Sequence, residues 1–358
     1  MSVTRLPSPR RAWAADHPVL DVLRRRRAED SRPGSRSDGY RVALAVEGGG
    51  LRGIVSAAML TALEDLGYTQ TFDVVYSCSS GAVNSAYFLV GDTWYPLSIY
   101  FDDLASKRFL DFRRGLRGRP LIDLDFALDE IVHFTKPMDY ASVRSSPIPL
   151  CIMVTNVDDL DTVLARDFTS DDDLRAALRA SMWLPIAVPG TTSFRGFRAV
   201  DGGVLTAHPF LVAQRTEDAP PTHVLSLSTR PMGSMRPGVS WLNRYVGTRL
   251  NRIRPGLGTG HLRSVQEYKQ ARVALERQRA EPVPGPYILD LAPLPAQREV
   301  VRHEMNPWRL FQGARDGYEV AYFALEGRYR RAMPRLVIPD HGRHDFRFPV
   351  DLDDGEQR

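Results

Sequence analysis

Short apolar runs alternate along the chain with segments of helical periodicity. Residues 40–46 form an apolar run, which is followed by Glu47 and by three glycines at 48–50. Residues 72–76 form a second apolar run. Runs of this length and composition are typical of strands buried on both faces of a sheet. Each run is followed by a helical pattern, over residues 51–66 and about 81–90. This order predicts a parallel sheet with helices on its faces.

The rest of the chain continues this pattern without an internal repeat. Further strands are expected over residues 148–155, 198–200, 224–228 and 287–291. Further helices are expected over residues 123–133, 171–184, 261–280 and 307–332. We therefore predict an α/β fold, a three-layer sandwich with a mainly parallel central sheet. Its expected organisation is a basic N-terminal arm and linker (1–40), one α/β domain (41–335) and a polar C-terminal tail (336–358).

Composition adds that the chain is globular and that its charge is uneven. Hydrophobic residues make up 43% and charged residues 25%, which excludes a disordered or low-complexity protein. The net charge is +4, and residues 1–41 alone hold ten arginines and five acids, which is +5. The other residues therefore sum to −1, so the body of the chain gives no indication of nucleic-acid binding.

The N-terminal region has two interpretations. The apolar residues 18–23 precede four arginines, 24–27. They are either a short helix that contacts an anionic membrane or a solvated helix end packed on the domain. No apolar run reaches the roughly 18 residues of a membrane-spanning helix, and no secretory signal pattern is present. We expect a cytoplasmic protein, with peripheral membrane contact left open, and no disulfide framework, since only Cys78 and Cys151 occur.

The first motif is the glycine-rich turn of residues 47–53. Glycines at 48, 49 and 50 leave the backbone N–H groups open to an anion at the start of a helix. The spacing also satisfies G-x-G-x-x-G, which is the dinucleotide-binding pattern. That interpretation needs an acid at the end of the second strand, whereas Asp73 lies at its start, so we disfavour it.

The second motif is a serine at the end of the second strand. Ser79 is followed by Gly81 and a helix, as in the nucleophile elbow G-x-S-x-G, although Ser77 replaces the first glycine. Ser80 is the alternative nucleophile, but Ala82 stands where its elbow needs glycine. Cys78 is expected to point into the sheet. The remaining alternative is a serine-rich turn that only caps the helix.

The third motif is Asp201, followed by Gly202 and Gly203 at the end of a predicted strand. A nucleophilic serine needs a base, and none of the eight histidines has a recognisable triad context. Two glycines leave the carboxylate of Asp201 unobstructed. Asp201 is therefore the candidate base.

In this order, the three motifs resemble the patatin-like phospholipase family. The segments Leu178–Pro185 and 120–125 also resemble parts of that family, and the likeness extends over roughly residues 15–330. The resemblance implies a patatin-like fold and a serine acyl hydrolase that acts on a lipid or another ester through a Ser79–Asp201 dyad. It implies an oxyanion hole at Gly48, Gly49 and Gly50, with Gly49 and Gly50 as the expected donors.

Neither a metal nor a cofactor is expected for this chemistry. Arg52 has two interpretations, contact with a substrate phosphate or an ion pair that pins the turn. Aromatic residues of segment 92–120 either form a groove for an acyl chain or belong to the core, and the nearby arginines either meet lipid headgroups or are simply solvated. Ser77 leaves one alternative function open, a catalytically weak or inactive protein that binds lipid through the same fold.

Overall fold

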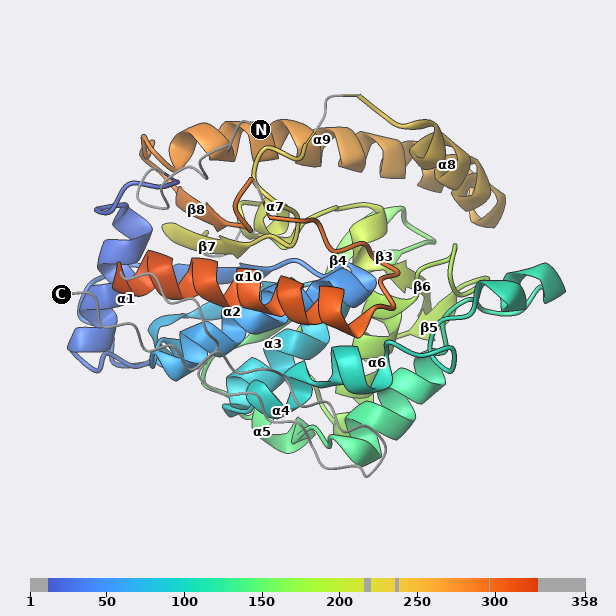
Figure 1. Cartoon of the computed structure of the whole chain (residues 1–358), viewed down its shortest axis with the longest axis horizontal. Coiled ribbons are helices and arrows are strands. Elements are labelled where there is room, and N and C mark those ends of the chain that lie inside the picture. The colour runs from blue at the N-terminus through green and yellow to red at the C-terminus, as the bar shows by residue number, and fades with distance from the viewer. Residues whose placement is uncertain (1–11, 216–219, 236–237, 296, 328–358) are drawn as a thin grey trace, which may run out of the picture.

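The chain is described by a computed structural model that places residues 12–215, 220–235, 238–295 and 297–327 (Figure 1). The strands are β1 (Val42–Val46), β2 (Val74–Ser77), β3 (Leu150–Asn156), β4 (Asp161–Ala165), β5 (Thr192–Phe194), β6 (Phe197–Asp201), β7 (His223–Leu227) and β8 (Tyr287–Leu291). The α-helices are α1 (Pro18–Ala28), α2 (Ile54–Asp65), α3 (Ser80–Val90), α4 (Trp94–Leu97), α5 (Tyr140–Arg144), α6 (Asp171–Met182), α7 (Pro209–Ala213), α8 (Trp241–Ile253), α9 (Leu257–Gln278) and α10 (Pro307–Glu326). Short 3-10 or π-helical segments are η2 (Gly50–Gly53), η3 (Thr69–Thr71), η4 (Ile99–Asp103), η5 (Phe112–Arg117), η6 (Phe126–Thr135) and η7 (Gly202–Val204).

The eight strands form one mixed sheet. Strands β3, β2, β1, β7 and β8 are parallel neighbours in this order. Strands β4 and β6 pair antiparallel with β3, and β5 pairs antiparallel with β6. Helices cover both faces, as Figure 1 shows. The predicted α/β fold with a mainly parallel sheet is confirmed.

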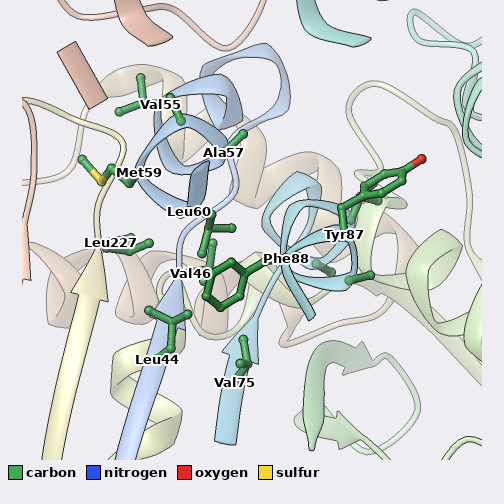
Figure 2. Packing of buried hydrophobic residues seen from close by; sticks show 14 of the residues in the cluster. Leu44, Val46, Val55, Ala57, Met59, Leu60, Val75, Tyr87, Phe88 and Leu227 are labelled. Carbon is green, nitrogen blue, oxygen red and sulfur yellow. The ribbon is translucent and has the colours of Figure 1, made fainter. Parts of the chain in front are cut away.

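Alternation along β1 explains the layers. Leu44 and Val46 belong to a core cluster with residues of α2, α3 and α10, and Ala43 and Ala45 belong to a second cluster with residues of α7 and α9. Figure 2 shows the first cluster, in which Leu60 of α2 lies beside Val46. Successive side chains of a strand point to opposite faces, so a strand buried on both faces is apolar throughout.

The N-terminal helix α1 packs on the domain. Its residues Val19, Leu20, Val22 and Leu23 are buried in the main core cluster. The buried guanidinium of Arg26 pairs with Asp38 at 2.7 Å and with Asp73 at 2.8 Å. This is the packed-helix alternative, and residues 12–40 are therefore not loosely attached. Residues 1–11 and the expected tail 336–358 lie outside the described residues.

Several elements differ from the sequence prediction. Helix α8 and strands β4 and β5 were not predicted, and residues 126–135 form the π-helical segment η6. Helix α10 is described to Glu326, so the end of the predicted helix 307–332 lies outside the described part. Within that part, none of the helices combines the length and apolar character that crossing a bilayer requires.

Candidate active site

Ser79 lies at the sharp turn between β2 and α3. Its backbone angles are φ 55° and ψ −136°, a conformation that residues other than glycine rarely adopt. The side chain is half-buried and therefore accessible. Backbone strain of this kind is concentrated at functional sites, and a serine nucleophile at a strand-to-helix turn is a known example.

The register of β3 brings Asp201 to this turn. Ser77 of β2 pairs with Ile152 of β3, and Asp201 of β6 pairs with Val154. Ile152 and Val154 also both pair with β4, so β2 and β6 share the opposite edge of β3. They run in opposite directions, and their C-terminal ends therefore face each other about two residues, roughly 7 Å, apart along that edge.

The carboxylate of Asp201 is buried among hydrogen-bond donors. Its Oδ1 accepts a 2.8 Å hydrogen bond from the Gly203 amide, and the Cys78 Sγ lies 3.5 Å away. Burial raises the pKa of Asp201, while hydrogen bonds from the Gly203 amide and the Ser79 hydroxyl, and the charge of Arg302, oppose this rise. A raised pKa makes the carboxylate a stronger base than a solvated aspartate.

The neighbours of Ser79 have other roles. Burial, and then the charge of Asp201, raise the pKa of the Cys78 thiol, so this thiol stays protonated at neutral pH. The Ser80 hydroxyl accepts a 3.1 Å hydrogen bond from the Gly49 amide, so it faces the glycine turn. Neither Cys78 nor Ser80 has the positive φ that places Ser79 at the apex of the turn.

The glycine turn packs directly on the serine turn. A side chain at Gly48 would collide with the Cys78 carbonyl oxygen, so only glycine permits this approach. Gly50 has a φ of 62°, and the next amide, of Leu51, donates to the Arg302 carbonyl at 3.0 Å. Among the described residues, the Gly48 and Gly50 amides have no hydrogen-bond partner, whereas the Gly49 amide is held by Ser80.

Glu47 and Arg52 form a buried ion pair at the two ends of the glycine turn. The Arg52 side chain is 2% exposed and lies 3.7 Å from Glu47, 2.8 Å from the Thr229 hydroxyl and 3.5 Å from Glu299. Burial would raise the pKa of Glu47, but Arg52 and other nearby cations lower it to about 2. Of the two interpretations of Arg52, this geometry favours the ion pair that pins the turn.

Ser181 of α6 is a site residue that the sequence analysis missed. Its hydroxyl accepts a 2.8 Å hydrogen bond from the Ser79 amide, and it also hydrogen-bonds the Cys78 thiol. Ser77, in contrast, is the last residue of β2 and is not among the described residues with positive φ. The replacement of glycine at position 77 therefore introduces no backbone strain.

One buried histidine does contact a serine, but not as a catalytic pair. His208 Nε2 lies 3.1 Å from Ser228 Oγ, and this hydroxyl donates to Asp290 at 2.6 Å. All three residues are buried, and the carboxylate contacts the serine rather than the imidazole. Burial lowers the pKa of His208 to about 4, so this network is neutral at the imidazole and structural.

Most aromatic residues of segment 92–120 belong to the core. Trp94, Tyr100 and Phe109 are buried in the main cluster, whereas Phe112 and Leu116 of η5 are exposed. Of the two interpretations of these aromatics, the core is therefore the one that fits most of the segment.

Among the described residues, no group of three or more histidine, cysteine or acidic side chains is arranged to hold a metal ion.

Comparison with known proteins matches this site to one family. Residues 44–213, which include Ser79 and Asp201, match the family model "Patatin-like phospholipase". The uncharacterized protein YjjU of Escherichia coli is 28% identical over 179 residues, 49% of each chain. Mouse 1-acylglycerol-3-phosphate O-acyltransferase Pnpla3 is 29% identical over 150 residues, 39% of this chain and 33% of the mouse protein. The chain thus spans half the length of these curated relatives, or less.

Two solved structures are more distantly similar. VipD from Legionella pneumophila is 13% identical with a TM-score of 0.44, over 80% of this chain and 67% of its own. Human GIVD cytosolic phospholipase A2 is 12% identical with a TM-score of 0.45, over 87% of this chain and 62% of its own. The family match confirms the resemblance that the three motifs predicted: residues 44–213 match a patatin-like phospholipase domain.

Proposed function

We propose that the protein is a serine acyl hydrolase that cleaves lipid esters, as a phospholipase A-type enzyme does, with Ser79 as nucleophile and Asp201 as base. The observation that carries this proposal is the position of Ser79 on a strained turn, where its hydroxyl lowers the pKa of the buried Asp201 carboxylate. The family match, and the acyltransferase activity for which the mouse relative is named, support a lipid substrate.

In the proposed reaction, Ser79 Oγ attacks the ester carbonyl carbon while its proton passes to Asp201. The tetrahedral intermediate then collapses, and Asp201 returns the proton to the departing alcohol, which leaves an acyl-enzyme. Asp201 next takes a proton from water, whose oxygen attacks the acyl carbon. Collapse of the second intermediate releases the fatty acid and restores the Ser79 hydroxyl.

The glycine turn would stabilise the negative charge on the carbonyl oxygen. The expected oxyanion hole comprises Gly48, Gly49 and Gly50. The free amides of Gly48 and Gly50 support this role, and the Gly49 amide would become a donor if Ser80 released it. Loss of one such donor typically slows an acyl transfer on the order of 100- to 1,000-fold. This mechanism requires neither a metal nor a cofactor.

A fluorophosphonate probe tests the nucleophile. We expect peptide mapping to locate the probe on Ser79. The Ser79→Ala variant should not be labelled, and the Asp201→Asn variant should be labelled much more slowly than wild type. Hydrolysis of p-nitrophenyl butyrate and of phosphatidylcholine should be lost in both variants. Cys78→Ala and Ser80→Ala are the matched controls and should retain most labelling. Labelling at another residue would relocate the nucleophile.

The alternative function, a lipid-binding protein with an impaired elbow, has weaker support. Its basis was the replacement of glycine by Ser77, which would strain a backbone with positive φ. Ser77 adopts the extended conformation of β2 instead. Wild-type protein that neither reacts with the probe nor hydrolyses either ester would favour this alternative over the enzyme.

A further inference from the structure

Helix α8 presents an apolar and basic face to solvent. Trp241 is 79% exposed, and Leu242 and Tyr245 are also more than half exposed. At 100° per residue, these three side chains and Arg249 and Arg252 fall within one 100° sector of the helix. Val246, Leu250 and Gly247 are buried on the opposite side. The exposed aromatic residues are therefore not part of the face by which α8 packs on the domain, because the helix buries a different face.

The charges within α8 and the segment that follows it have one sign. Residues 240–266 contain five arginines and no aspartate or glutamate. Among the residues that the structure describes, Arg244, Arg249 and Arg252 form no ion pair. Other exposed arginines do, for example Arg198 with Asp158 at 2.8 Å. The α8 face thus combines large apolar side chains with cations that lack a partner.

The segment η5 is a second projection of the same kind. Leu116 is 90% exposed and Phe112 is 54% exposed, and none of the residues of η5 is buried. Arg117 and Arg119 are exposed and have no ion pair among the described residues. In Figure 1, α8 and the teal segment that contains η5 both extend from the right side of the molecule.

Both projections are connected to the candidate active site. Val246 and Leu250 of α8 pack in one cluster with Val204, three residues after Asp201. On η5, Phe112 contacts the His303 ring at 5.6 Å, and the neighbouring Arg302 carbonyl binds the glycine turn through Leu51. We call Trp241, Leu242, Tyr245, Arg249 and Arg252 of α8, with Phe112, Leu116 and Arg117 of η5, the α8–η5 surface.

We propose that the α8–η5 surface docks the protein on a bilayer that contains anionic lipids, a proposal that rests on the proposed function. Tryptophan and tyrosine side chains prefer the interface of a bilayer, and arginines there bind lipid phosphates while their stems lie among apolar groups. A second copy of this chain fits less well, because its α8–η5 surface would bring arginines against arginines. Docking here would place both projections on the membrane.

Vesicle sedimentation with the Ser79→Ala protein, which cannot consume the lipid, tests this proposal. We expect binding to phosphatidylcholine vesicles with about 30% phosphatidylglycerol, and weaker binding to phosphatidylcholine alone or at high salt. Trp241→Ser with Tyr245→Ser should weaken binding about tenfold or more, and Arg249→Gln with Arg252→Gln should weaken binding to anionic vesicles specifically. Leu116→Ser should weaken binding independently of α8.

Matched controls lie elsewhere on the surface. Phe134→Ser removes an exposed aromatic from η6, and Arg25→Gln with Arg277→Gln removes two exposed charges from α1 and α9. Thermal melting verifies that each variant is folded. Equal vesicle binding by wild-type and α8 variants overturns the proposal, as does a wild-type dimer that the α8 variants dissociate. Hydrolysis of soluble p-nitrophenyl butyrate by unmodified protein tests the proposed function separately.

Discussion

The Ser79 amide and the Ser181 hydroxyl, 102 residues apart in the chain, are joined by a 2.8 Å hydrogen bond. This bond ties the strained turn that carries the serine to the C-terminal part of α6. Ser181 also lowers the pKa of the Cys78 thiol, which lies 3.5 Å from Asp201, so this hydroxyl borders both members of the proposed dyad. Ser181 bonds the backbone amide of Ser79 and not its hydroxyl, so in the proposed reaction it would act as a positioning residue.

Replacement of Ser181 by alanine should therefore reduce turnover more than substrate binding. We expect kcat to fall about 10- to 100-fold, with KM changed less than about threefold, because small displacements of a nucleophile are costly. Ser181→Thr should restore much of the rate. Ser85→Ala removes a buried hydroxyl that bonds only a helical carbonyl and serves as the control. An equal loss in both alanine variants would contradict a positioning role.

The pH dependence of hydrolysis should report the state of Asp201. Burial raises the pKa of Asp201, and only the ionised carboxylate can accept the serine proton, so kcat/KM should fall as pH decreases through this raised pKa. Arg302 lowers the pKa of Asp201, so Arg302→Gln should move the acid limb to higher pH. Arg298→Gln, an exposed neighbour, should leave it in place. A shift to lower pH would contradict this assignment.

Restoring glycine at the elbow should change little. Ser77 is extended and fully buried, so Ser77→Gly gains no conformational relief and removes a side chain from β2. We expect kcat/KM within about twofold of wild type. A gain of tenfold, about 1.4 kcal/mol, would reveal a penalty that the backbone geometry does not indicate.

Arg52→Gln should weaken the fold and lower activity toward all substrates alike. The substitution removes the nearest cation from the buried Glu47 carboxylate, at a cost of about 3 kcal/mol. If Arg52 only pins the turn, kcat/KM for a phospholipid and for a neutral ester should fall by the same factor. A loss confined to the phospholipid would instead place Arg52 at the substrate phosphate.

The attachment of α1 is testable through stability. Arg26 is fully buried between Asp38 and Asp73, and its guanidinium also binds the carbonyls of Tyr40 and Thr71. Arg26→Ala should lower the free energy of unfolding by about 3 to 5 kcal/mol, as measured by urea denaturation. The exposed Arg25→Ala should change it by less than about 0.5 kcal/mol. Equal effects would mean that α1 contributes little through this ion pair.

The parallel half of the fold could be predicted from the sequence because its strands are mostly apolar on both faces, and all of them except β3 are followed along the chain by a helix. Ser79, Asp201 and the glycine turn could be selected as candidates from the sequence because they occur at strand ends, where backbone geometry restricts the choice of residue. Strand β4 was not found, since its exposed and half-buried positions lack the continuous apolar pattern. Helix α8 was missed because most of its residues are polar or exposed.

Ser181 could not be identified for a different reason. A serine near the end of a helix is common, and only the tertiary packing of α6 against the turn gives it a role. The two interpretations of Arg52 were likewise inseparable in the sequence, because burial is a property of the fold. The site thus depends on local patterns for its reactive groups and on long-range contacts for their support.

Strand β3 sets the distance between the two residues of the proposed dyad. Because β2 and β6 end against Ile152 and Val154 on one edge, the separation of serine and aspartate is counted in residues of β3. A slip of β6 by one residue would shift Asp201 by about 3.4 Å and turn its carboxylate to the other face of the sheet. Insertions in the connections between these strands are therefore tolerable to the dyad, whereas a single inserted residue within β3 between these two positions is not.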